Sequence, residues 1–265
     1  MLDRLQWIKL QPASWAHWGA VRGGLQTHQE LSRKYPGAQA FVVEAQEARA
    51  QAVIKSIAKP WWRPERWSGA GAARVQTPPP GTVDMLWANM ALHESADPQA
   101  LLADWHRSLK VGGFLMFSCL GPDTARELRD IYRALGWPPA GHELTDMHDW
   151  GDMLVQTGYA EPVMDMERIT LTYATPQRLL EELRELGRNF HPGRFPTLRG
   201  RAWRQGLFEL LSKELPRQPD GQLTLTFEVI YGHALKAQAK IKVSPMSAVS
   251  EQDMRAMLQG GRRGP

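Results

Sequence analysis

The chain contains 265 residues, 43% hydrophobic and 23% charged, which excludes a chain too polar to form a core. Its single cysteine, Cys119, excludes an internal disulfide, and no secretion signal or membrane-spanning run is evident, so we expect a cytoplasmic protein without a membrane partner. The net charge of +4 arises from residues 236–265, which hold six Lys or Arg and two Asp or Glu but no nucleic-acid motif, so nucleic acid is not an expected partner.

The first half of the chain alternates strand patterns with amphipathic helix patterns. In chain order we predict a helix over residues 25–35, a strand over 40–43, a helix over 47–57, a buried strand over 83–93, a helix over 98–110 and a buried strand over 114–120. Asp97 and Pro98 suit the start of the fifth element, and Gly112-Gly113 suits its end. The tryptophan-rich stretch 60-PWWRPERW-67 indicates either an interaction surface or the edge of a core.

A glycine-rich segment stands ahead of the first of these helices. Gly19, Gly23 and Gly24 lie where a nucleotide-binding α/β domain has its phosphate- or cofactor-binding loop, and a turn that begins a helix explains them equally well. Glu44 follows the strand predicted over 40–43, the second strand of the domain, where a carboxylate suits the two hydroxyls of a ribose. The alternative is an exposed residue at a strand end.

The second half of the chain predicts a change of topology. We expect helices over residues 124–135, 149–157, 176–187 and 201–214, and alternating strands over 162–175 and 222–234, the last antiparallel at or next to a sheet edge. The order of elements predicts a three-layer α/β/α domain over residues 1–236, with a helical insertion at about 175–220 before the last strand. Residues 237–265 are predicted to form a disordered basic tail.

The segment 142-HELTDMHDWGD-152 gathers acidic and histidine side chains. Such residues bind first-row metals, but Asp146 is also a good residue to cap the helix that follows. We favour the cap and expect no metal site.

Three stretches carry a resemblance to a known family: 84-DMLWANMALH-93, 107-RSLKVGGFLMFSCLGPDTARELR-129 and 167-ERITLTYATPQRLLEELRELGRN-189. They resemble the malonyl-[acyl-carrier protein] O-methyltransferases of biotin synthesis, which are class I methyltransferases that use S-adenosylmethionine. The resemblance implies a Rossmann-like fold, methylation of the free carboxylate of a malonyl thioester, and an acyl-carrier protein as partner. It also implies that two family features are altered here. The N-terminal helical segment is largely missing, and His17 or Trp18 stands where the loop after the first strand has an acidic residue.

The resemblance further assigns roles to individual residues. The S-adenosylmethionine site is expected to include Gly19, Gly23, Gly24, Glu44, Asn89 and Ala91. The alternatives are a turn cap for Asn89 and plain core for Ala91. Arg22 would repel the ammonium group of the cofactor unless it turns to the cofactor's carboxylate.

Substrate contacts are expected from Arg168, Asn189 and Arg194, each of which has a structural alternative. Residues 188–217 contain seven Lys or Arg and two Asp or Glu, so Arg194, Arg199, Arg201 and Arg204 are candidates to dock the acidic carrier. A solvated helix face is the other explanation for this charge.

No catalytic residue is predicted, because a carboxylate is already nucleophilic and needs no general base. Two other functions remain open at this point. The chain could be a non-catalytic relative that binds an acyl-carrier protein or another partner, or a methyltransferase for another small carboxylic substrate.

Overall fold

A computed structural model describes residues 1–57 and 73–238 of the chain. The tryptophan-rich stretch 60–67 lies outside the described residues, as does nearly all of the predicted tail. In the two described ranges no helix has the length and apolar character needed to cross a membrane.

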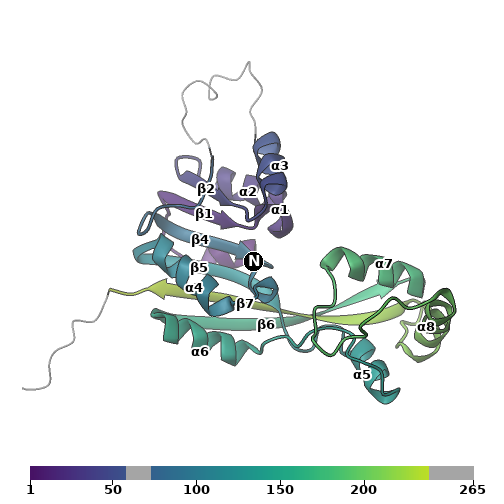
Figure 1. The fold of residues 1–265 in the computed structure, drawn as a ribbon. Helices are drawn as coiled ribbons and strands as arrows, with labels where there is room; N and C mark the ends of the chain where they lie inside the picture. The colour runs from purple at the N-terminus through teal and green to yellow at the C-terminus, as the bar shows by residue number, and fades with distance from the viewer. Residues whose placement is uncertain (58–72, 239–265) are drawn as a thin grey trace, which may run out of the picture.

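A seven-stranded sheet, in the order β3-β2-β1-β4-β5-β7-β6, forms the middle of the fold (Figure 1). Its strands are β1 (Ser14–Trp18), β2 (Gln39–Val43), β3 (Arg74–Val75), β4 (Val83–Asn89), β5 (Leu109–Leu120), β6 (Tyr159–Tyr173) and β7 (Leu223–Lys236). The first five are parallel, and β7 runs antiparallel between β5 and β6. The α/β prediction with an antiparallel last strand next to the sheet edge is therefore confirmed. Because β1 lies between β2 and β4, the strand order reverses there, which is where open α/β sheets bind ligands.

Helices flank this sheet. They are η1 (Leu2–Trp7), α1 (Ala20–Gly23), α2 (Leu25–Lys34), α3 (Glu47–Ile57), η3 (Leu92–Glu94), α4 (Pro98–Ser108), α5 (Arg126–Ala134), α6 (Met147–Thr157), α7 (Pro176–Leu186) and α8 (Arg201–Glu214). Helix α4 begins as expected, with the Asp97 carboxylate accepting from the N–H of Ala100 at 2.9 Å and Pro98 in the first turn.

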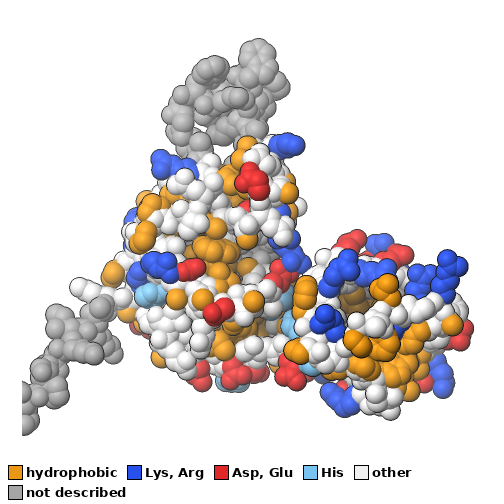
Figure 2. Space-filling model, in the orientation of Figure 1, with side chains coloured by type: hydrophobic (Ala, Val, Ile, Leu, Met, Phe, Trp, Pro, Cys, Tyr) orange, Lys and Arg blue, Asp and Glu red, His pale blue; other side chains and the backbone are white. Residues whose placement is uncertain are grey.

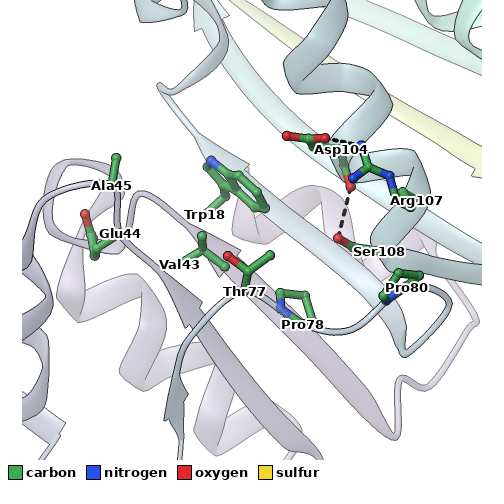
Figure 3. Close-up of a pocket in the computed structure, with 10 residues that line it drawn as sticks. All are labelled: Trp18, Val43, Glu44, Ala45, Thr77, Pro78, Pro80, Asp104, Arg107 and Ser108. Carbon is green, nitrogen blue, oxygen red and sulfur yellow. Dashed lines mark hydrogen bonds and ion pairs between the residues drawn. The ribbon is translucent and has the colours of Figure 1, made fainter.

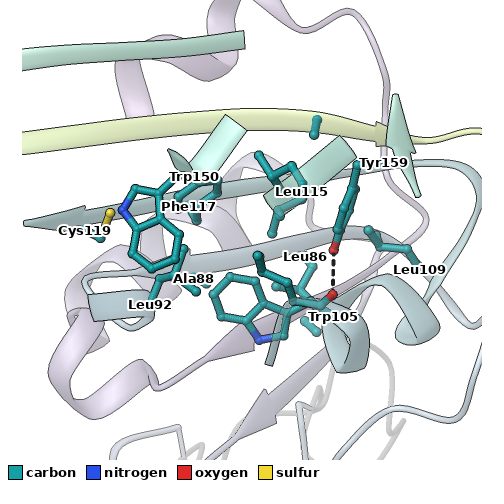
Figure 4. Close-up of a cluster of buried hydrophobic side chains, with 14 of the residues drawn as sticks. Leu86, Ala88, Leu92, Trp105, Leu109, Leu115, Phe117, Cys119, Trp150 and Tyr159 are labelled. Atoms are coloured by element: carbon teal, nitrogen blue, oxygen red, sulfur yellow. Dashed lines mark hydrogen bonds between the residues drawn. The ribbon is translucent and has the colours of Figure 1, made fainter. Parts of the chain in front are cut away.

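The core lies on both faces of the parallel strands because successive side chains point to opposite faces. Trp15, Met85 and Trp87 pack on one face with Leu31 of α2. Leu86 and Phe117 pack on the other with Trp105 of α4 and Trp150 of α6, as Figure 4 shows. Burial of both faces explains the unbroken apolar runs of β4 and β5.

The boundary between α4 and β5 differs from the prediction. The helix ends at Ser108 and the strand already begins at Leu109, so Gly112-Gly113 lies inside β5, where the register with β4 shifts. A Cβ atom at Gly113 would lie 3.0 Å from the carbonyl oxygen of Asp84, and Gly112 has a φ of +79°. The glycine pair therefore allows a bulge against β4 and does not end the helix.

Strands β6 and β7 extend well past the parallel sheet, and α7 and α8 pack at their far end beside α5 (Figure 1). We call residues 176–214 the insertion lobe. Leu179, Leu207 and Leu211 of the lobe pack on Leu223 and Leu225 of β7. The lobe is thus anchored to the sheet by its own apolar cluster.

Candidate functional site

The glycine segment follows β1 and packs directly on the end of β4. Gly19 has a φ of +70°, a left-handed conformation that favours glycine. At Gly23 a Cβ atom would lie 2.9 Å from the carbonyl oxygen of Asn89 and 3.1 Å from Nε2 of His17. Gly24 has a φ of +101° and precedes α2. Glycine is therefore required for the loop to approach β4 and to turn into the helix.

Two side chains at the ends of β2 and β4, the strands on either side of β1, hold this loop. Nδ2 of Asn89 donates to the carbonyl oxygen of Gly23 at 2.7 Å, and Oδ1 of Asn89 accepts from Oγ of Ser118. Oε1 of Glu44 accepts from the N–H of Val21 at 2.7 Å. No described residue binds the other carboxylate oxygen of Glu44. Asn89 thus joins the glycine loop to β5 through its side-chain hydrogen bonds, and one carboxylate oxygen of Glu44 remains free to bind another partner.

His17 is one of the two residues, with Trp18, that the family resemblance puts where an acidic residue is expected. Its side chain is fully buried and stacks on His28 with ring centroids 5.7 Å apart, and neither of its nitrogens has a partner among the described residues. Burial, and then the proximity of His28, lowers the pKa of His17 to about 3. His17 is therefore a neutral core residue under the loop.

A cavity of about 370 Å³ lies on the sheet face beside Glu44. We call it the sheet-face cavity. Trp18, Val43, Glu44 and Ala45 form one side, and residues 77–80 and α4 form the other (Figure 3). The indole of Trp18 packs edge-on against Trp105, with centroids 6.1 Å apart. A free carboxylate oxygen beside an aromatic, apolar wall fits a ribose and its base. Ala91 packs on the same apolar cluster as Trp18.

Arg22 lies in the glycine loop, but its charge is paired. Its guanidinium forms an ion pair with Glu94 and donates to the carbonyl oxygen of Leu186, at the end of α7, at 2.8 Å. Burial raises the pKa of Glu94, and Arg22 opposes that rise. The arginine expected either to repel or to bind a charged cofactor group therefore joins the loop to the insertion lobe.

A second cavity, which we call the chamber, has a volume of about 670 Å³ and lies between the ends of β4 and β5 and the insertion lobe. Its walls are mainly apolar, with Leu120, Ala125, Leu128, Leu144 and Leu183 among the lining residues. Its polar lining residues include Arg22, His93, Arg129, His142, Arg188 and Asn189. The chamber suits an apolar or partly charged small group.

His93 is a neutral part of the chamber wall. Its Nδ1 accepts from the N–H of Leu120 at 3.3 Å. Burial, then the charges of His142 and Arg22, lowers its pKa to about 4. At neutral pH it therefore carries no charge.

The three substrate candidates lie in different places. Asn189 lines the chamber, where its Nδ2 donates to the carbonyl oxygen of Pro139 at 2.8 Å. Arg168 lies on β6, outside the chamber lining, and pairs with Asp123 at 2.7 Å. Arg194 is exposed and donates to the carbonyl oxygen of His191 at 3.3 Å. The structure thus brings only Asn189 into the chamber, and the three substrate roles stay predictions.

Within the segment 142–152, Asp146 caps the helix α6. Oδ1 of Asp146 accepts from the N–H of His148 at 2.8 Å, at the start of α6. Within residues 1–57 and 73–238, no group of three or more His, Cys, Asp or Glu side chains is arranged to hold a metal ion.

Two chamber residues, His93 and Arg129, were not identified as site candidates from the sequence. Arg129 belongs to the run Glu-Leu-Arg that carries part of the resemblance. Its place in this run was a usable signal, because the predicted helix that holds the run follows a predicted strand end.

Comparisons with known proteins agree on fold and family. A family described as a methyltransferase domain matches residues 23–117. The malonyl-[acyl-carrier protein] O-methyltransferase of Gallionella capsiferriformans is 39% identical over 248 residues, which cover 91% of this chain and 83% of the relative. The protein of the same name in Legionella pneumophila is 34% identical over 91% of this chain and 84% of its own.

Solved structures support the fold alone. The YcgJ protein of Bacillus subtilis matches with a TM-score of 0.55 at 12% identity, covering 85% of this chain and 92% of its own. A protein of Bacillus halodurans matches with a TM-score of 0.54 at 14% identity, covering 89% and 99%. The Rossmann-like class I methyltransferase fold expected from the sequence is confirmed.

Proposed function

Because this chain belongs to the malonyl-[acyl-carrier protein] O-methyltransferase family, we propose that it methylates the free carboxylate of a malonyl group on an acyl-carrier protein. S-adenosylmethionine is the methyl donor, and biotin synthesis is the pathway that the relatives imply. The observation that carries the proposal is the extent of the similarity. It spans the cofactor edge of the sheet and the insertion lobe together, since the match to the first relative covers 91% of the chain.

The residues at the switch point fit this donor. Glu44 lines the sheet-face cavity and its free oxygen would accept from the ribose hydroxyls, and the aromatic wall at Trp18 would lie against the adenosine. Gly19, Gly23, Gly24 and Asn89 would shape the loop, with Ala91 in the wall beneath it. When bound, S-adenosylmethionine supplies an activated methyl group and leaves as S-adenosylhomocysteine.

The chain's own contribution is positioning and exclusion of water. The acceptor is a carboxylate, which is deprotonated at neutral pH, so its oxygen attacks without a base and the product is a neutral methyl ester. His93, with a pKa of about 4, stays neutral and takes no proton in this step. The apolar chamber walls remove water from the carboxylate and make its alignment with the methyl group the main requirement.

The insertion lobe offers a basic surface for the carrier. Figure 2 shows Lys and Arg side chains gathered over the lobe. Of the four arginines expected to dock the carrier, Arg194, Arg201 and Arg204 are exposed. An acidic carrier docked on them would present its acyl group to the chamber, which Asn189 and Phe190 line. Arg199 differs, because its guanidinium stacks on the rings of Trp203 and Phe195.

The test is conversion of malonyl-acyl-carrier protein to its methyl ester, followed by mass spectrometry of the intact carrier. The expected result is one added methyl group that depends on S-adenosylmethionine. The matched control is acetyl-acyl-carrier protein, which has no free carboxylate and should gain no methyl group. Lack of methylation of the malonyl carrier, in a preparation that binds S-adenosylhomocysteine, would overturn the proposed substrate.

A further inference from the structure

We propose that Arg129 binds the carboxylate of the acyl group inside the chamber and so selects acyl groups that end in a carboxylate over neutral ones. This inference rests on the proposed function, because it assigns the acceptor group to the chamber. It concerns a residue that none of the predicted site roles includes.

The position of Arg129 is fixed by a buried carboxylate on β7. Glu228 is 4% exposed, and its Oε2 accepts from the N–H of Asp123 at 2.7 Å. Its backbone carbonyl accepts from the N–H of Gly121 at 2.9 Å. The turn that these bonds hold presents the carbonyl oxygen of Pro122 to Nη2 of Arg129. The guanidinium is therefore tethered at the chamber wall by one neutral hydrogen bond.

The cations of the chamber differ in how their charge is balanced. Arg22 is paired with Glu94, and His93 is neutral. Arg188 is exposed, so water solvates it. Arg129 is half-buried and forms no ion pair with any carboxylate in the described part of the chain. It is thus the chamber cation that has neither a counter-ion nor full access to water.

One nitrogen of the Arg129 guanidinium group lacks a hydrogen-bond partner among the described residues. Nε is buried, and no described group accepts its N–H. A buried donor without an acceptor is destabilising, and an anion bound by the guanidinium would offset part of that cost. Because the walls beside it are the apolar side chains of Leu120, Ala125 and Leu128, an incoming carboxylate would exchange its water for this cation.

The chemistry of the reaction agrees with a single guanidinium contact. A carboxylate has two equivalent oxygens, and a cation that binds one of them leaves the other free to form the new bond to carbon. A neutral acyl group offers nothing to Arg129 and would leave its charge unpaired in the chamber. The site therefore favours a carboxylate-terminated acyl group before any chemistry occurs.

The experiment compares binding of malonyl-pantetheine and acetyl-pantetheine to the full chain saturated with S-adenosylhomocysteine, by calorimetry. We expect the wild type to prefer the malonyl compound by at least about tenfold, and Arg129→Gln to lose that preference. Arg126→Gln is the matched control, because Arg126 lies on the same helix, is exposed and pairs with Asp123 at 3.5 Å. It should keep the preference, and Arg129→Lys should keep part of it.

Each further outcome bears on the proposal. A malonyl preference unchanged in Arg129→Gln overturns it, as does a parallel loss of S-adenosylhomocysteine affinity, which would show that Arg129 only supports the fold. A wild type that prefers malonyl-pantetheine through Arg129 but methylates no malonyl carrier would support the carboxylate site and overturn the proposed function instead.

Discussion

The rings of His17 and His28 stack 5.7 Å apart beneath the glycine loop, and neither nitrogen of His17 has a hydrogen-bond partner in the described part of the chain. Burial, and for His17 also the neighbouring histidine, lowers their pKa values from 6.5 to about 3 and about 4. The folded protein thus accepts only the neutral rings, whereas the unfolded chain protonates them below pH 6.5. Their stabilisation is fully present above pH 6.5 and is lost as the pH falls.

We therefore predict a steep acid dependence of stability. Below pH 6.5 each of these rings should lower the free energy of unfolding by about 1.4 kcal/mol per pH unit. Urea unfolding at several values between pH 7.5 and 5 measures the slope. In His28→Leu the dependence of the free energy of unfolding on pH should be weaker by about 1.4 kcal/mol per pH unit, which corresponds to one proton. An identical slope in the variant and the wild type would contradict the prediction.

Replacing Glu44 should separate its two roles. In Glu44→Gln the amide oxygen can still accept from the N–H of Val21, so the loop is held, but the charge facing the cavity is lost. We expect S-adenosylhomocysteine to bind about tenfold more weakly, as the loss of one charge-assisted hydrogen bond implies, and still more weakly in Glu44→Ala. Calorimetry measures both affinities, with Glu47→Gln at the start of α3 as the control. If Glu44→Ala binds S-adenosylhomocysteine as tightly as the wild type, Glu44 takes no part in binding the cofactor.

The lobe arginines should fall into two groups. Arg199 lies 4.0 Å from the ring centroid of Trp203 and 4.3 Å from that of Phe195, so Arg199→Glu should lower the melting temperature of the protein. Arg201 and Arg204 are exposed, and the contact of Arg204 with the Phe208 ring is longer, at 5.7 Å from the centroid, so the double change to Glu should lower stability much less. That change should slow association with the carrier about tenfold at low salt and reduce its salt dependence.

Surface plasmon resonance at two ionic strengths tests this division. Lys213→Glu, on the same helix, is the control, because Lys213 already lies 3.3 Å from Glu214. If the double variant associates with the carrier as fast as the wild type does, the basic surface of the lobe takes no part in docking the carrier.

Truncation should locate the end of the folded region. Lys236 donates from Nζ to the carbonyl oxygens of His106 and Leu109, both at 2.7 Å, so the chain is needed up to this residue. A chain ending at Ala237 should melt close to the full-length temperature. One ending at Thr226 loses most of β7, which pairs with both β5 and β6, and should unfold or aggregate. Differential scanning calorimetry measures the melting temperature of both truncated chains. If both are destabilised equally, the folded region does not end near Lys236.

Much of the fold was predictable because it depends on local patterns. The apolar run from Val83 and the alternation after Leu223 each report which sides of a strand are buried. Gly112-Gly113 misled the prediction, because a glycine pair ends a helix or forms a bulge with the same residues, and only the pairing with β4 decides. The two-residue strand β3 is too short to produce a period.

The chamber was harder to predict than the sheet. Arg22 meets the carbonyl of Leu186 across 164 positions of sequence, and no local pattern reports such a contact. Arg168 was expected to contact the substrate, but it lies outside the chamber lining and pairs with Asp123, 45 positions away in the sequence. Glu44 could be named as a candidate because its place at a strand end is a local property of the sequence.

The insertion lobe departs from the sheet and returns to it at neighbouring points. Tyr173 at the end of β6 pairs directly with Leu223 at the start of β7, so the 49 residues between them form a closed excursion from a two-stranded ribbon. A short turn could join the same two ends without disturbing the strands. We therefore expect that this excursion can be replaced as a unit by one that fits another carrier or acyl group, with the pairing of β6 and β7 kept.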